Sequence, residues 1–527
     1  MRTLARAQLR KSIKTNQPSP GEIPMRDIIH PQIQLGALDI GSIELDLKSR
    51  DEIPQILLGL QHVYITPALR EQVFAILEEV LPQSVVDGEN AKADPNNGRP
   101  GMAQWTILVL GILRLGLNAD YDHIQELANQ HSTIRQMLGH SDWSDETHYA
   151  LQTLRDNLRL FTPEIMDRIN LVVVNAGHQA LKKSPEGVAD ALNGRCDSSV
   201  VKTDVHFPTD ISMLSDAVRK VIDVSVELAN LNNLSGWRQS AYLQRQFKKQ
   251  YRKVQRLRHS NSKDEKKKAQ KAQEILDAYL LLLNMALNLI ARAELTRQQS
   301  PENCPITMVL RLKLDGYIAH ASRQIDQTDR RVLQGEVIPH DEKYFSIFET
   351  HTEWISKGKA GVPVELGLRV CIMEDNNGFI LHHQVMEKTT DDKVAVSMVD
   401  ETRQRFPALS TVSMDKGFHT PANQIALKER LDLVVLPKKG RLSKADKARE
   451  YDPEFIKLRH QHSAVESAIN ALESHGLDKC PDHGIEGFKR YVSMAIVARN
   501  VHRLGAVLRQ QEREAKERKR GPYKKAA

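Results

Sequence analysis

Three acidic residues that are far apart in the sequence lie where a sheet could bring them together. Asp197 is in a run rich in Val, Thr and Ser that predicts a strand, Asp415 follows the strand-like stretch STVSM, and Glu466 is in a helical stretch after the last predicted strand. Clustered carboxylates repel one another unless a cation neutralises them. Because Mg²⁺ takes oxygen ligands, and two such ions about 3.5–4 Å apart promote phosphodiester displacement, the acids predict a site for two Mg²⁺ or Mn²⁺ ions.

Neighbouring acids leave alternatives open. Asp204 and Asp210 follow Asp197 closely, but strand alternation places Asp204 on the opposite face from Asp197, so we expect turn and loop roles for both. Glu473 lies two helical turns after Glu466 on the same face of the predicted helix. Spacing alone therefore allows either glutamate to be the third acid.

Basic residues beside the acids could bind the phosphates of DNA. Lys416 adjoins Asp415 and is a candidate for contact with the scissile phosphate. Arg459 and His462 share the helix face of Glu466 and could hold a phosphate, although solvated side chains are an equally good interpretation.

Three basic segments, 245–271, 437–448 and 513–525, could follow the DNA backbone and bind it with an affinity that falls with salt. Part of the first segment could instead be a solvated helix face. His206 could contact DNA or orient a carboxylate, or it could have only a structural role. The candidate DNA-binding residues of the first two segments are Lys248, Lys249, Arg252, Lys438, Lys439 and Arg441.

The order of predicted elements supplies the sheet that the acids need. After the strand with Asp197 comes a long helical stretch, about 214–297, whose apolar part ILDAYLLLLNMALNLIARAE should be buried. A hairpin around Asn377 and Gly378 follows, and helices then alternate with strands. This order predicts an α/β fold with helices flanking a mixed sheet. Short helices within 102–160 are compatible with a helix-turn-helix unit, or with a helical cap that has no DNA role.

Composition limits the class of protein. A chain of 527 residues is too long for one ordinary core, and 40% hydrophobic with 27% charged residues is typical of a soluble protein. Four cysteines without C-x-x-C spacing argue against a disulfide framework, and Cys480 with His483 forms at most half of a metal site. The longest apolar run, 105–117, is too short to span a bilayer and predicts a buried helix instead. No signal peptide pattern is present. We expect a cytoplasmic protein without membrane contact.

The chain resembles bacterial insertion-sequence transposases with an RNase H-like DDE domain, specifically the ISNCY-type group. The resemblance rests on RCDSSVVKTDVHFPTDISMLSDAVRK with its H-[FY]-P-T-D signature, on DKGF followed by Asn423, and on SAVESAINALESHGLDKC with the downstream GFKRYVSMAIVARNVHRLG. The stretch from GRPGM to ANQHSTIRQMLGH also resembles the DNA-binding region of this group. The similarity covers most of the chain, from about residue 51 to residue 505.

The resemblance implies that Asp197, Asp415 and Glu466 are the catalytic acids and metal ligands, and it favours Glu466 over Glu473. A related branch of transposases carries Tyr, Arg, Glu and Lys along this helix. The corresponding positions here are Arg459, His462, Glu466 and Glu473, so that pattern is absent.

The activity that the resemblance implies is DNA transposition. Metal-held water would cut DNA at the terminal inverted repeats of the element, and the freed 3′-hydroxyl would attack target DNA. Pairing of two element ends implies at least a homodimer. The alternatives are a metal-dependent nuclease without strand transfer and a catalytically inactive, domesticated DNA-binding protein.

The sequence divides into six predicted segments. They are a flexible N-terminal segment 1–50, a helical DNA-binding region 51–165, the first part of an RNase H-like catalytic domain 190–213, a helical insertion with a basic tip 214–300, the remainder of the catalytic domain 305–508 and a basic disordered tail 509–527.

Overall fold

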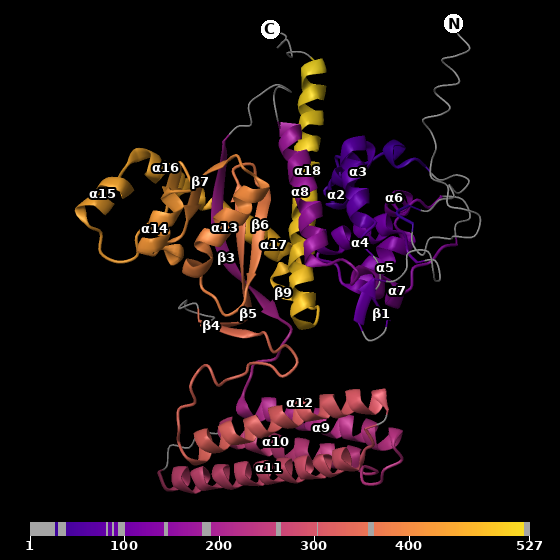
Figure 1. Ribbon diagram of the computed structural model, residues 1–527, viewed down its shortest axis with the longest axis vertical. Coiled ribbons are helices and arrows are strands. Elements are labelled where there is room, and N and C mark those ends of the chain that lie inside the picture. Colours follow the sequence, from indigo (N-terminus) through magenta and orange to yellow (C-terminus); the bar gives the residue numbers. More distant parts are fainter. Residues whose placement is uncertain are drawn as a thin grey trace. The chain divides into compact units, whose positions relative to one another are not determined.

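A computed structural model describes residues 27–29, 38–80, 83–86, 89–92, 101–141, 146–181, 191–259, 265–302, 304–356 and 363–520 (Figure 1). The chain forms two compact units, residues 1–201 with 369–527, and residues 202–368. Most of the N-terminal segment predicted to be flexible, and the end of the basic segment 513–525, lie outside the described residues.

A mixed sheet of seven strands organises the first unit. Its path runs β4-β5-β3-β7-β8, while β6 also pairs with β5 and β9 with β3. The neighbours β3, β7 and β8 are parallel, and β5 and β6 form an antiparallel hairpin. The strands are β3 (Leu192–Thr203), β4 (Glu353–Ser356), β5 (Val364–Asp375), β6 (Ile380–Met386), β7 (Leu409–Met414), β8 (Leu433–Val435) and β9 (Lys479–Cys480). The second unit contains β4, the end of β3 and the start of β5.

The hairpin turn confirms the prediction made from Asn377 and Gly378. Gly378 has φ +82°, a conformation that glycine adopts without a steric penalty. Asp375 is fully buried, and its carboxylate accepts hydrogen bonds from the backbone N–H groups of Asn377 at 2.8 Å and Phe379 at 2.9 Å. Apolar side chains such as Val370 on β5 are buried, which fixes the register of the sheet.

Helices α8 (Pro163–Leu181) and α18 (Gly484–Arg520) run side by side and pack against β6 (Figure 1). The side chain of Asn500 on α18 fixes this packing. Its amide donates to the Asn170 side chain at 2.6 Å and to the Ile380 carbonyl at 2.8 Å, and its oxygen accepts from the Ile380 N–H at 2.9 Å. Because all these groups are buried, each hydrogen bond also avoids the cost of an unpaired polar group.

The N-terminal helices are attached to α18. They are α2 (Ile53–Ile65), α3 (Pro67–Leu77), α4 (Gln104–Gly116), α5 (Tyr121–Gln130), α6 (Ser132–Met137) and α7 (Leu151–Leu158). Helix α4 is buried along its whole length, as predicted for the apolar run 105–117. Both α2 and α4 pack on α18. A role of this region in DNA recognition remains a prediction.

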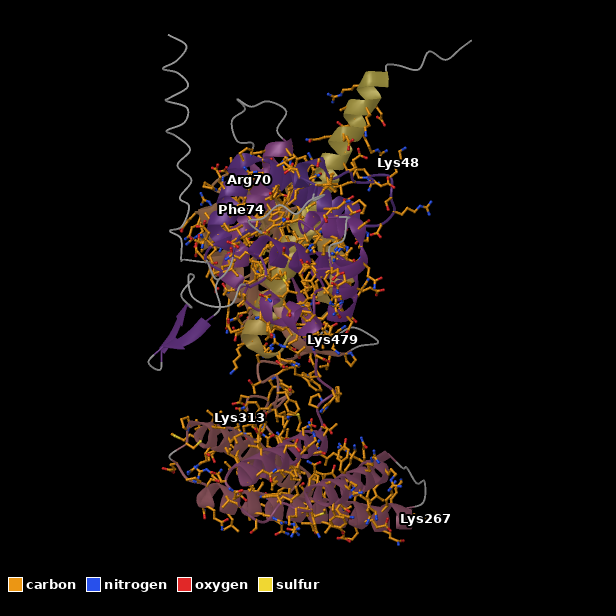
Figure 2. The ribbon with its side chains drawn as sticks, turned by 90° about the vertical axis from the view of Figure 1, so that its right-hand side faces the viewer. Lys48, Arg70, Phe74, Lys267, Lys313 and Lys479 are labelled. Carbon is orange, nitrogen blue, oxygen red and sulfur yellow. The ribbon has the colours of Figure 1, made fainter. Side chains whose placement is uncertain are left out.

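Four long helices form the second unit. They are α9 (Asp210–Leu231), α10 (Ser240–His259), α11 (Glu265–Gln299) and α12 (Pro305–Thr328). Leu214, Val221, Trp237 and Leu282 belong to their common core. The helical insertion is therefore longer than the predicted 214–300, because α12 packs along α9. Figure 2 shows Lys267 on α11 and Lys313 on α12, both of which are exposed.

Two sequence predictions about helices are wrong. The apolar part of α11 is not buried on all sides, since Leu280, Leu281 and Leu287 are exposed by 44%, 49% and 49%. The tail 509–527, predicted to be disordered, is helical as far as Arg520 because it continues α18. Ion pairs one helical turn apart, such as Lys516 with Glu512, support this end of the helix.

One helical stretch among the described residues, Lys267–Gln299, is long and apolar enough to cross a membrane. A core helix of a soluble protein can pass the same test, and this stretch forms part of the four-helix core.

Candidate active site

The register of two neighbouring strands brings the first two acids together. Strands β3 and β7 are parallel, and Cys196 lies opposite Met414. Asp197 and Asp415 are the next residues on each strand, so they are at the same level of the sheet. Strand β7 ends at this level, whereas β3 continues to Thr203, so the two acids lie beside the carboxyl end of β7. Ligands bind outside the carboxyl ends of strands in open α/β sheets.

Glu466 reaches this edge from helix α17 (Ala464–Leu472), where it lies in the first turn. The preceding helix, α16 (Pro453–His462), packs against β7 and β8. A hydrogen bond of 3.0 Å between His462 Nδ1 and Ser413 Oγ joins the end of α16 to the strand that precedes Asp415. Glu466 follows His462 by about one helical turn.

The electrostatics of Asp197 show that the acids influence one another. Burial is the largest effect and raises the pKa of Asp197, while a hydrogen bond from the Ser198 N–H opposes this rise. The negative charges of Asp415, Asp391 and Glu466 raise it further, so that the pKa of Asp197 reaches about 6. The charges of three carboxylates from three separate elements thus act on the half-buried Asp197.

Asp391 is a fourth acid that sequence reasoning missed. It is the first residue of helix α13 (Asp391–Arg405), and its Oδ1 accepts a hydrogen bond of 2.7 Å from Ser198 Oγ. Its Oδ2 also lies close to Gly417, where an added Cβ would be 3.1 Å away. The only signal for Asp391 in the sequence is an acid in the first turn of a predicted helix, which is the usual position for helix-dipole stabilisation.

The basic candidates near the acids have different surroundings. Lys416 follows Asp415 and is exposed, as is Arg459 on α16. Burial is the main effect that lowers the pKa of His462, although Asp415 and Glu466 raise it in part. Arg195 was not predicted as a site residue, although it is two positions before Asp197 and on the same face of β3.

Arg195 forms an ion pair with a buried glutamate and also borders a hollow. Its Nη1 lies 3.3 Å from Glu374 Oε2. Burial raises the pKa of Glu374 to about 7, although the Arg195 charge lowers it in part. The hollow, of about 720 Å³, is also lined by Asn193 of β3, Lys457 of α16 and Ser467 of α17. Polar side chains thus continue from the acids along the same side of β3.

The remaining predicted residues belong to other elements than those that carry the acids. Lys438 is held by an ion pair with Asp446, whereas Lys439 and Arg441 are exposed in the loop after β8. Lys248, Lys249 and Arg252 are exposed on α10 of the second unit.

The alternative acids Asp210 and Glu473 lie at the ends of helices. Asp210 begins α9 and pairs with Arg331, and Glu473 lies where α17 ends. Glu466, by contrast, is among the charges that raise the pKa of Asp197. The structure therefore brings Glu466 toward the other acids, and the catalytic roles of all three remain predictions.

His206 has a clear structural partner. Its Nε2 lies 2.6 Å from Asp216 Oδ2. Burial by itself lowers the pKa of His206, but this contact and a hydrogen bond with the Phe207 carbonyl more than offset the effect of burial, so the pKa is raised. Of the three roles considered for this histidine, the contact with Asp216 supports the structural one.

The carboxylate group suits a divalent cation by its chemistry. Within the described ranges, no group of three or more His, Cys, Asp or Glu side chains has an arrangement that could hold a metal ion as it stands. The donors at the sheet edge are nonetheless all carboxylate oxygens, the ligands that Mg²⁺ and Mn²⁺ prefer. Burial is the main cause of the raised pKa of Asp197, and a cation among the acids would remove the repulsion that raises this pKa further.

A comparison with known protein families finds a match over part of the chain. Residues 332–501 match the family of the transposase DDE domain. The matched range contains Asp415 and Glu466 but not Asp197, which precedes the helical insertion. Neither the curated proteins nor the solved structures give a match. The match supports a DDE transposase, and the mixed seven-stranded sheet is consistent with an RNase H-like DDE domain.

Proposed function

We propose that this protein is a DNA transposase of the ISNCY-type group that cuts DNA at the ends of an insertion sequence and joins the free 3′-hydroxyl to target DNA. One observation carries the proposal: the charges of Asp415, Asp391 and Glu466, which come from separate elements, all act on the half-buried Asp197. The match of residues 332–501 to the transposase DDE domain supports the same conclusion.

Asp197, Asp415 and Glu466 would hold two Mg²⁺ or Mn²⁺ ions. When bound, these ions supply an activated water and stabilise the charge on the leaving oxygen. The protein's own contribution is to orient the carboxylates. The hydrogen bonds from Ser198 to Asp197 and Asp391, of 2.8 Å and 2.7 Å, serve this orientation.

Basic side chains would position the DNA around the acids. Lys416 and Arg459 are exposed and can bind phosphates by charge-assisted hydrogen bonds. His462 would act as a neutral hydrogen-bonding group, since its pKa is lowered mainly by burial. The hollow beside Arg195 offers further polar contacts for a DNA strand.

Other parts of the chain would also bind DNA. The exposed residues Lys439 and Arg441, and the basic residues of α10, would bind DNA backbone. The N-terminal helices would recognise the terminal inverted repeats. Pairing two such ends requires two copies of the chain, so we expect a homodimer that works in the cytoplasm without membrane contact.

The proposal is tested with the purified protein, Mg²⁺, a DNA fragment that carries both ends of the element and a target plasmid. Asp197→Asn, Asp415→Asn and Glu466→Gln should each lower cleavage by at least about 100-fold, because each removes an anionic ligand. Glu473→Gln is the matched control and should keep near wild-type cleavage.

The products separate the alternatives. Joined products in which element ends are linked to the plasmid establish strand transfer. Cleavage without joined products would indicate a nuclease instead, and full activity of the three acid variants would remove the catalytic assignment altogether.

A further inference from the structure

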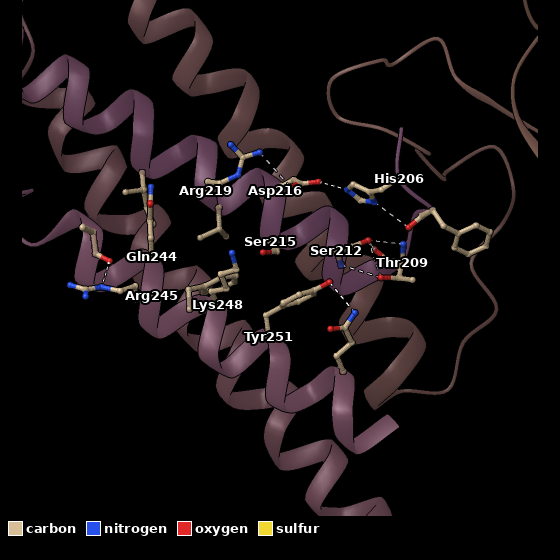
Figure 3. A pocket seen from close by; sticks show the side chains of 16 residues that line it. His206, Thr209, Ser212, Ser215, Asp216, Arg219, Gln244, Arg245, Lys248 and Tyr251 are labelled. Atoms are coloured by element: carbon tan, nitrogen blue, oxygen red, sulfur yellow. Dashed lines mark hydrogen bonds and ion pairs between the residues drawn. The ribbon is translucent and has the colours of Figure 1, made fainter. Parts of the chain in front are cut away.

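A groove of about 730 Å³ lies between helices α9 and α10 of the second unit. Figure 3 shows it from close by, with Ser212 and Ser215 of α9 opposite Lys248 and Tyr251 of α10. We call it the α9–α10 groove and define it by Ser212, Ser215, Arg219, Arg245, Lys248 and Tyr251. The catalytic acids proposed above make no use of this groove, although its basic residues on α10 are among the contacts proposed for the DNA backbone.

The wall that α10 contributes to the groove is strongly cationic. Helix α10, SAYLQRQFKKQYRKVQRLRH, contains seven Lys and Arg residues and no Asp or Glu. A second hollow of about 650 Å³ continues along this helix and is lined by Arg245, Lys248, Lys249, Arg252, Gln255 and Arg256. Their spacing follows one helix face. A continuous row of exposed cations suits a ligand with regularly spaced negative charges.

The opposite wall does not neutralise this charge. Asp216 on α9 is engaged by His206 at 2.6 Å and by Arg219 at 3.5 Å. Within the described part of the second unit, Lys248 forms no ion pair. The side chain of Arg245 donates through Nε to the Ala241 carbonyl, a contact that leaves its charge uncompensated. Charge thus favours an anionic ligand in the groove.

An exposed aromatic corner borders the same groove. Phe207 lines the groove and also an adjoining hollow of about 280 Å³, together with Arg258, Lys343 and Trp354. The side chain of Phe207 is 61% exposed, and its ring centroid lies 5.5 Å from that of Trp354. We call Phe207 and Trp354 the aromatic corner. Large exposed aromatic rings beside cations are typical of surfaces that stack nucleic-acid bases.

From these features we infer that the α9–α10 groove and the aromatic corner bind single-stranded DNA. Phosphates lie along the cations of α10, and a base stacks on Phe207. The base must be unpaired, because in a duplex its faces are covered by its neighbours. Ser212, Ser215 and Tyr251 are only partly exposed in the recess, where a single strand fits more easily than the wide surface of a duplex. This inference rests on the proposed function, since it takes DNA as the ligand.

The test measures the fluorescence anisotropy of labelled DNA with the full chain. Three probes are compared: oligo-dT of about 15 nucleotides, a blunt duplex, and the same duplex with a single-stranded overhang. We expect the overhang to tighten binding at least about 5-fold relative to the blunt duplex, because stacking of one base adds an interaction of this order.

Two variants assign the effect to the groove. Phe207→Leu keeps an apolar side chain but removes the ring, and should weaken oligo-dT binding about 5- to 10-fold while blunt duplex binding stays within 2-fold. Tyr242→Leu is the matched control, because Tyr242 is an exposed aromatic residue of α10, 51% exposed, that does not line the groove.

Lys248→Gln should weaken oligo-dT binding and reduce the salt dependence of that binding. Lys313→Gln on α12 is the charge control.

The outcomes distinguish this inference from the proposed function. Three results would each overturn the inference while cleavage at element ends stays intact. They are equal binding of the blunt and overhang duplexes, unchanged oligo-dT binding by the Phe207→Leu variant, and displacement of oligo-dT by polyglutamate at the same charge concentration. Absence of both duplex binding and Mg²⁺-dependent cleavage would instead overturn the proposed function. Selective loss of oligo-dT binding in Phe207→Leu supports the inference.

Discussion

At the scale of single residues, Asp197 links the stability of the chain to its chemistry. Its pKa of about 6 exceeds the ordinary value of 3.8, so between these values the folded state binds more protons than the unfolded state. Stability therefore falls as pH rises through this window, and the full penalty is present above about pH 6. A site that holds ionised acids close together is costly for the fold until a cation neutralises them.

The first residue-scale prediction concerns Asp197→Asn. In EDTA at pH 7.5 the variant should be more stable than the wild type by roughly 1–3 kcal/mol, because the charge penalty is gone, and the difference should vanish near pH 4. Added Mg²⁺ should raise the Tm of the wild type but not of the variant. Calorimetry measures both effects, and a variant that is less stable at pH 7.5 would contradict the electrostatic interpretation.

Asp391 gives a second residue-scale prediction. Its carboxylate holds the Ser198 hydroxyl at 2.7 Å and so supports the backbone next to Asp197. Asp391→Asn keeps the shape but removes the charge, and should lower cleavage about 10-fold while raising the Mg²⁺ concentration needed for half-maximal rate. Asp392→Asn is the matched control, because it changes the neighbouring acid, whose carboxylate accepts from Thr390 instead. Equal effects of the two variants would show that only helix-terminal charge matters.

At the scale of elements, the close approach of α2 and α18 fixes the N-terminal helices to the first unit. A Cβ on Gly59 of α2 would collide with the Val501 carbonyl of α18, and a Cβ on Gly505 with the Gln55 carbonyl. Glycine at these positions therefore allows the two backbones to pack in contact. The gain is a tight interface, and the cost is the lower helix propensity of glycine, about 1 kcal/mol relative to alanine.

Two glycine-to-alanine variants test this packing. Gly59→Ala should destabilise the first unit by about 1–3 kcal/mol, because overpacking exceeds the gain in helix propensity. Gly316→Ala on α12 is the matched variant, since nothing lies within 4 Å of an added Cβ there. It should stabilise the second unit by about 0.5–1 kcal/mol. Calorimetric transitions report both changes, and a stabilising Gly59→Ala would refute the close packing.

The elements also show what the sequence can and cannot predict. The hairpin at Asn377 and Gly378 was predictable because its turn chemistry is local, and the buried α4 because its apolar run is continuous. Helix α12 was missed as part of the insertion because its partner α9 is distant in sequence. Asp391 was missed for the same kind of reason, since its partner Ser198 lies on another element. Periodicity identifies a helix, but it does not identify the partner of that helix.

At the scale of the whole molecule, the distribution of charge matters more than its total. The net charge of the chain is only +7, and α10 alone carries seven basic residues without an acid. The remainder of the chain is therefore close to neutral as a whole. Binding to the DNA backbone should then depend on a few local surfaces, of which the exposed face of α10 is the most concentrated.

The dependence of DNA affinity on salt concentration measures how much the exposed face of α10 contributes to binding of the DNA backbone. The triple variant Lys248→Gln, Lys249→Gln, Arg252→Gln should lower the slope of log affinity against log salt concentration for duplex DNA by up to about 0.9 for each phosphate contact that is lost. The control triple, Lys313→Gln, Lys393→Gln, Lys428→Gln, removes the same charge from exposed positions on α12, α13 (Asp391–Arg405) and α14 (Pro421–Lys428). It should leave the slope nearly unchanged, because scattered cations release few condensed counterions. Equal slopes for the two triples would mean that the total charge, and not its placement on α10, governs binding.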